Sequence, residues 1–121
     1  MLTARHVIDD LNRNRPASQI TLLAFVDAFR RAGPAERQSM LAEGPADLSG
    51  NNEGLVAAVA SALCREVRMT PAEWVAKTFS PTPYFLPDAR STALRARLIL
   101  ESPAPFKVRN VFVPENFLHR A

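Results

Sequence analysis

Few side chains in this sequence have the types and the spacing that catalysis or metal binding requires. The two histidines, His6 and His119, lie at opposite ends of the 121 residues, and the single cysteine, Cys64, lies in an apolar stretch. A metal site needs several His, Cys or carboxylate ligands close together, and a nucleophilic triad needs a Ser or Cys beside a histidine that a carboxylate orients. The sequence provides neither pattern, so we expect no catalytic residue, no metal site and no cofactor.

The adjacent Asp9 and Asp10 are the nearest approach to a carboxylate pair. Neighbouring residues on a helix point about 100° apart, so these two carboxylates would not reach the same substrate. The four glycines form no phosphate-binding loop of the Walker or Rossmann type. A lone cysteine among apolar residues is typical of a small, inert core residue. The residues therefore favour a protein that binds over one that catalyses.

Composition predicts a folded domain with an apolar core. Hydrophobic residues make up 47% and charged residues 22% of the chain, which is ordinary for a globular protein. One cysteine cannot form the disulfide framework of a small secreted fold. The sequence begins without the regions of a signal peptide, and it has no run of about 18 apolar residues that could cross a membrane. We therefore expect a single helical domain over residues 1–121, in the cytoplasm and without a membrane partner.

Hydrophobic periodicity predicts helices along most of the chain, because apolar residues recur at intervals of three and four. Residues 53–68 are small or apolar on nearly every face, which predicts the central helix of the fold. Thr70 and Glu73 have the spacing of a capping box around Pro71, which predicts the start of the next helix. The expected helices span residues 4–13, 19–32, 35–43, 53–68, 71–79 and 89–101, with a last helical turn at 115–120.

The expected fold class is all-α: a compact bundle of five to seven helices with a proline-rich, extended C-terminal segment. Prolines disfavour helix in residues 80–88 and 103–114, and a short strand is expected within 108–113. Leu94 and Ile99 are expected to face inward together with Leu98. The residues expected in the core are Leu23, Phe25, Val26, Phe29, Val59, Leu63, Trp74, Leu98 and Phe106.

Basic residues gather in the second half of the chain, although the net charge is only +3. Residues 61–121 carry nine basic and five acidic side chains, against six and seven in residues 1–60. Such an excess either meets an acidic protein face or phosphate, or is solvated surface with local pairing, such as Arg97 with Glu101. The candidate partner-binding residues are Arg90, Arg95, Arg97, Lys107, Arg109, Phe117 and Arg120.

A DNA-binding regulator of the helix-turn-helix type is one alternative, and a structural homodimer is another. The turn would be Met69-Thr70-Pro71, with residues 71–78 as the recognition helix. That segment holds one Lys, one Glu and a Trp, which is poor equipment for contacts to phosphates or base edges. We therefore expect nucleic-acid binding to be weak, indirect and sensitive to salt.

The C-terminal half carries a family resemblance. Residues 101–106 read Glu-Ser-Pro-Ala-Pro-Phe, followed by basic residues, Asn110 and the Val-Phe-Val of 111–113, while Pro71-Ala72-Glu73-Trp74 lies upstream. Over about residues 53–121 the chain resembles a family of small bacterial proteins that lie beside nucleotidyltransferase-like proteins in toxin–antitoxin pairs. The resemblance implies a non-catalytic, antitoxin-like role with a nucleotidyltransferase-like toxin as the partner. Val108 departs from the pattern, since a basic residue is common there.

Overall fold

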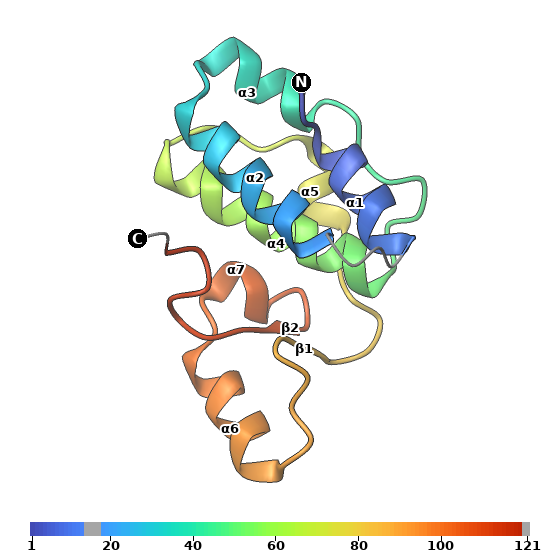
Figure 1. The fold of residues 1–121 in the computed structure, drawn as a ribbon, viewed down its shortest axis with the longest axis vertical. Helices are drawn as coiled ribbons and strands as arrows, with labels where there is room; N and C mark the ends of the chain where they lie inside the picture. Colours follow the sequence, from blue (N-terminus) through green and yellow to red (C-terminus); the bar gives the residue numbers. More distant parts are fainter. Residues whose placement is uncertain (14–17, 120–121) are drawn as a thin grey trace.

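Helices make up most of the structure, as the spacing of apolar residues predicts. The fold is that of a computed structural model, which describes residues 1–13 and 18–119 (Figure 1). Within these ranges the helices are α1 (Ala4–Asn12), α2 (Ser18–Arg31), α3 (Pro34–Leu41), α4 (Asn51–Glu66), α5 (Glu73–Lys77), α6 (Thr92–Glu101) and α7 (Ala104–Lys107). Two short strands, β1 (Tyr84–Phe85) and β2 (Val111–Phe112), pair in parallel. The mostly helical class is confirmed. In the described parts of the chain, no helix is long and apolar enough to cross a membrane.

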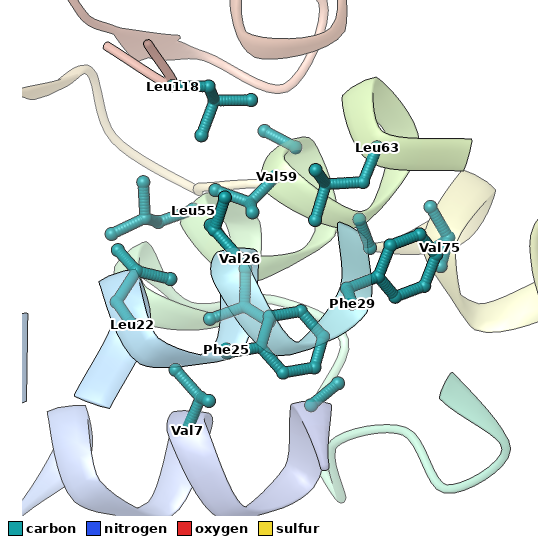
Figure 2. Close-up of a cluster of buried hydrophobic side chains, with 14 of the residues drawn as sticks. Val7, Leu22, Phe25, Val26, Phe29, Leu55, Val59, Leu63, Val75 and Leu118 are labelled. Carbon is teal, nitrogen blue, oxygen red and sulfur yellow. The ribbon is translucent and has the colours of Figure 1, made fainter. Parts of the chain in front are cut away.

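Helix α4 forms the centre of the core, as its composition predicts. Most of its 16 residues are buried, including Leu55, Val59 and Leu63. Helices α1, α2, α5 and α7 all contact α4. In Figure 2 the side chains of α2, with Phe25 and Phe29 among them, meet those of α4 in one apolar cluster. This cluster is the platform on which the rest of the chain is built.

Local sequence signals set several helix ends. The side chain of Thr3 accepts a hydrogen bond from the backbone N–H of His6 (3.2 Å), which caps α1. Pro34 is the first residue of α3, where its missing N–H costs nothing. After α4 the chain reverses at Arg68, whose φ of 57° is left-handed, and Met69 N–H donates to the Cys64 carbonyl (2.9 Å). Those two features close α4 with a Schellman-type turn.

Two of the expected core residues are only half-buried. Leu22, and not Leu23, is the buried leucine at this point, because the side chain of Leu22 is on the face of α2 that packs in the core. Trp74 lies at the edge, where its indole N–H donates to the Leu41 carbonyl (2.7 Å) and its ring closely approaches Gly44. The others are buried as predicted: Phe25, Val26, Phe29, Val59, Leu63, Leu98 and Phe106.

Three expectations about elements need correction. Helix α5 begins at Glu73, with Ala72 at the capping position, so Thr70 forms no capping box. Residues 103–114 are not extended throughout, because α7 occupies four of them; proline is tolerated in a first helical turn, where Pro105 lies. Residues 115–118 form a turn rather than a helix.

Helix α6 projects from one end of the molecule, opposite α3 along the long axis (Figure 1). It begins at Thr92, after the side chain of Ser91 accepts a hydrogen bond from Leu94 N–H (3.1 Å). Contrary to expectation, Leu94 is 37% and Ile99 is 41% exposed, and Leu98 is the buried residue of this helix. The apolar residues of α6 are therefore divided between two faces.

Candidate protein-binding surface

Arg109, one of the predicted partner-binding residues, is a structural side chain. It donates to the Val75 carbonyl from Nε (3.2 Å) and Nη2 (3.1 Å), and to the Pro105 carbonyl from Nη1 (2.7 Å). Partial burial lowers the pKa of Arg109, and the charge of Arg65 lowers it further. These bonds tie the end of α7 to α5, so the guanidinium is engaged within the fold.

Arg95 lies on α6 and is held on one side by the fold. Its Nε donates to the Ala89 carbonyl (2.6 Å), and its guanidinium carbon lies 5.4 Å from the centre of the Phe85 ring. Phe85 in turn stacks on Phe112 of β2, with ring centres 5.0 Å apart. A guanidinium has five N–H donors, and the hydrogen bond to Ala89 uses one of them.

Arg90 and Arg97 are solvent-facing cations with weak local partners. Arg90 Nε lies 3.7 Å from Asp88, and both side chains are over four-fifths exposed (92% and 82%). Arg97 Nε lies 3.4 Å from Glu101 Oε1, the i,i+4 pair that the sequence suggests. Exposed pairs of this kind contribute about 0–1 kcal/mol, so a partner could replace either one at little cost.

The remaining predicted residues that the structure describes differ in their exposure. Lys107 is exposed at the end of α7. Phe117 is half-buried and packs edge-on against Phe106, with ring centres 5.7 Å apart. Arg120 lies outside the described residues. The structure therefore groups Arg95 and Arg97 on one helix, just after Arg90, and packs Arg109 and Phe117 into the fold.

The outward surface of α6 is apolar apart from Thr92 in its first turn. Ala93, Ala96, Ile99 and Leu100 are exposed, and at about 100° per residue they fall within an arc of roughly 120°. We call these four residues the outer face of α6. Leu100 is 80% exposed, the largest value among the exposed large hydrophobic residues of the described chain. Most surface helices show the reverse pattern, with charged residues towards water.

The inner side of α6 is fixed to the fold by one buried apolar residue and by hydrogen bonds. Leu98 is 2% exposed. The hydroxyl of Ser102, at the end of the helix, lies 2.6 Å from the Leu98 carbonyl and accepts from Val113 N–H (2.8 Å). These contacts leave the outer face uncovered and hold it in a fixed orientation.

Sequence reasoning missed the outer face because it assigned Ile99 to the core. The signal was present, since Ala93, Ala96 and Leu100 have the i, i+3, i+7 spacing of one helix face. Leu94 and Leu98 have the i, i+4 spacing of another. A helix with two apolar stripes can bury either one within its own chain, and only the structure shows which.

Helix α5, the recognition helix of the DNA-binding alternative, has only five residues. Val75 is buried, and its carbonyl accepts the hydrogen bonds of Arg109. The indole N–H of Trp74 donates a hydrogen bond to the Leu41 carbonyl. Lys77 is the one basic residue of α5, which is little more than one turn long, and its ammonium pairs with the carboxylate of Glu73. This geometry gives little support to reading of DNA bases by α5.

The residues with the most reactive side chains are one cysteine and two histidines. Cys64 is 1% exposed, and burial raises the pKa of its thiol, which disfavours the nucleophilic thiolate. His6 lies 3.8 Å from Asp10 on α1, and His119 is exposed near the other end of the chain. Within residues 1–13 and 18–119, no three His, Cys, Asp or Glu side chains form a group that could hold a metal ion.

A cavity of about 400 Å³ lies between α1, α2, α4 and the segments that follow β1 and β2. Its described lining is mostly apolar, and its ionisable members are Tyr84 and His119. The Tyr84 hydroxyl donates a hydrogen bond to the Asn52 side chain (3.2 Å), and burial raises the pKa of Tyr84. Gln19, Tyr84 and His119 are the polar residues of the described lining, and the other lining residues are apolar, as in many ligand pockets.

No protein-family model, no curated protein and no solved structure matches this chain.

Proposed function

We propose that this chain is a non-catalytic protein-binding module and that its partner docks on the outer face of α6. The observation that carries the proposal is an apolar helix face that is exposed within the described chain, with Leu100 80% and Ile99 41% exposed. Exposed apolar surface is costly in water, and burial in an interface recovers about 25 cal/mol per Å². The arginines on α6 then lie at the rim, where charge contributes to specificity.

The identity of the partner is the second part of the proposal. The family resemblance supports a nucleotidyltransferase-like protein encoded next to this chain, with this chain as the antitoxin-like member of the pair. The burial of Cys64, which disfavours its reactive thiolate, supports a role without chemistry of its own. Nucleotidyltransferase sites hold metal ions with carboxylates, so an arginine-rimmed surface suits such a partner.

Co-expression with that neighbouring protein tests the proposal. The chain should co-purify with it, and the double variant Ile99→Gln/Leu100→Gln should weaken the complex at least tenfold by calorimetry. The matched control is Ile20→Gln, which changes an apolar side chain that is 69% exposed on α2. Equal binding by both variants would place the interface elsewhere. Absence of a complex with the unchanged chain would reject the partner.

A further inference from the structure

We infer that the element docking on α6 is an amphipathic helix whose apolar stripe carries Asp or Glu on both sides. The inference rests on the proposed function and names the chemistry of the partner at that same surface. It follows from the shape of the outer face, from the charges that flank it and from the mismatch of this face with a second copy of itself.

The shape of the outer face fits a helix. Ala93 and Ala96 are small, so a second backbone can approach closely, while Ile99 and Leu100 provide large side chains to pack between those of the partner. Helix α6 has ten residues, about 15 Å long, which matches two to three turns of a partner helix. An arc of roughly 120° is also the width of the apolar stripe on an amphipathic helix.

The charges at the edges of the outer face have one sign. Arg95 and Arg97 flank Ala96, each rotated by about 100° and in opposite directions. The acidic residue of α6, Glu101, lies on the Arg97 side, at 3.4 Å from it, and is 30% exposed. Arg95 has no carboxylate within ion-pair distance among the described contacts, since its partners are the Ala89 carbonyl and the Phe85 ring. On the Arg95 side, no carboxylate of the described residues supplies the complementary charge, so a partner can supply it.

A second copy of the chain does not supply that charge. In an antiparallel pairing centred on Ala96, each arginine lies on the same side as its own equivalent in the other copy. In a parallel pairing, Arg95 of one copy faces Arg97 of the other. Like charges across an interface are unfavourable, so both arrangements oppose self-association through this face. A helix with Asp or Glu beside its apolar stripe would instead form favourable ion pairs with Arg95 and Arg97.

A display library of amphipathic helices tests the inference directly on the intact chain. All members share one apolar stripe pattern, and the flanking positions vary among Glu, Gln and Lys. Selection should enrich Glu on both flanks, and exchange of the flanking Glu for Lys in a selected peptide should weaken binding about tenfold or more. The charge-reversed chain Arg97→Glu should select Lys on the corresponding flank, while Ile20→Gln should select as the unchanged chain does.

The outcomes separate this inference from the proposed function. Identical selection by the unchanged and charge-reversed chains, or no enrichment at all, would overturn the acidic-helix partner. Binding of selected peptides that survives Ile99→Gln/Leu100→Gln would overturn it too.

A dimer in sedimentation that Leu100→Gln dissociates would show that a second copy takes the face. RNA binding that is indifferent to Leu100→Gln but lost in Arg97→Glu would assign the arginines to phosphate. The complex with the neighbouring protein can survive each of these failures.

Discussion

The helical body, formed by α1, α2 and α4, and the projecting helix α6 use apolar side chains in opposite ways. In the body Phe25, Phe29 and Leu63 are fully buried, whereas in α6 Leu98 is buried and Leu100 is 80% exposed. Burial of a large apolar side chain stabilises a fold by about 1.5–3 kcal/mol. The apolar side chains of the body therefore stabilise the fold, whereas the exposed apolar side chains on the outer face of α6 contribute little to its stability. The apolar content of a helix does not reveal its role until the covered face is known.

The two regions also differ in how they are held. The body is one continuous apolar cluster (Figure 2). Helix α6 depends on the single buried side chain of Leu98, on the contact of Arg95 with Phe85, and on the hydroxyl of Ser102. Polar attachment is directional, so it fixes the orientation of α6 with little buried area. The same difference sets the order of the effects expected on mutation.

The largest effect is expected in the body. Phe29→Ala should lower the free energy of unfolding by about 3–5 kcal/mol, because it leaves a cavity at a position that is 0% exposed. Urea unfolding followed by circular dichroism measures the loss. The matched control is Phe79→Ala, where the ring is 48% exposed and the loss should be well below half as large. Equal losses would contradict the division between covered and uncovered residues.

The next effect is expected where the segment after α7 meets α5. Arg109→Met should lower the free energy of unfolding by about 2–3 kcal/mol, since it removes charged hydrogen bonds to the Val75 and Pro105 carbonyls. The control Lys107→Met changes an exposed cation and should alter stability by about 0.5 kcal/mol or less. If Arg109→Met is as stable as the control, Arg109 is a surface residue after all. On the present geometry, Arg97 is the better residue for testing binding.

The sequence predicts the body well because its helices repeat one apolar stripe. Phe25, Val26 and Phe29 have helical spacing and a single apolar face, so burial follows from periodicity alone. The candidate surface is harder to predict from the sequence. The sequence groups Arg109 with the α6 arginines, because the Val75 carbonyl to which Arg109 donates lies 34 positions away in the chain. Long-range hydrogen bonds of this kind leave no local pattern.

A smaller and more local effect is expected at the attachment of α6. Ser102→Ala leaves the buried N–H of Val113 without its acceptor, which costs about 1–3 kcal/mol. Because the contact joins α6 to the segment after β2, amide exchange should speed up in α6 and at Val113 and stay slow in α4. The control Ser39→Ala removes an exposed hydroxyl from α3 and should change none of these rates. Faster exchange in α4 as well would mean that α6 and the body unfold together.

The smallest effect on stability is expected on the outer face of α6. This measurement tests most directly whether that face is exposed. Leu100→Gln and Ile99→Gln should each alter the free energy of unfolding by about 0.5 kcal/mol or less, because glutamine suits a helix and both side chains already meet water. Leu98→Gln makes the same chemical change two positions from Leu100 and should cost more than about 2 kcal/mol, since Leu98 is 2% exposed. Urea titrations of the three variants side by side measure the contrast. A large loss for Leu100→Gln would mean that its side chain is covered within the chain, which would leave the proposed surface without its central residue. A negligible loss leaves two large apolar residues that add nothing to the fold, and binding then accounts for their position.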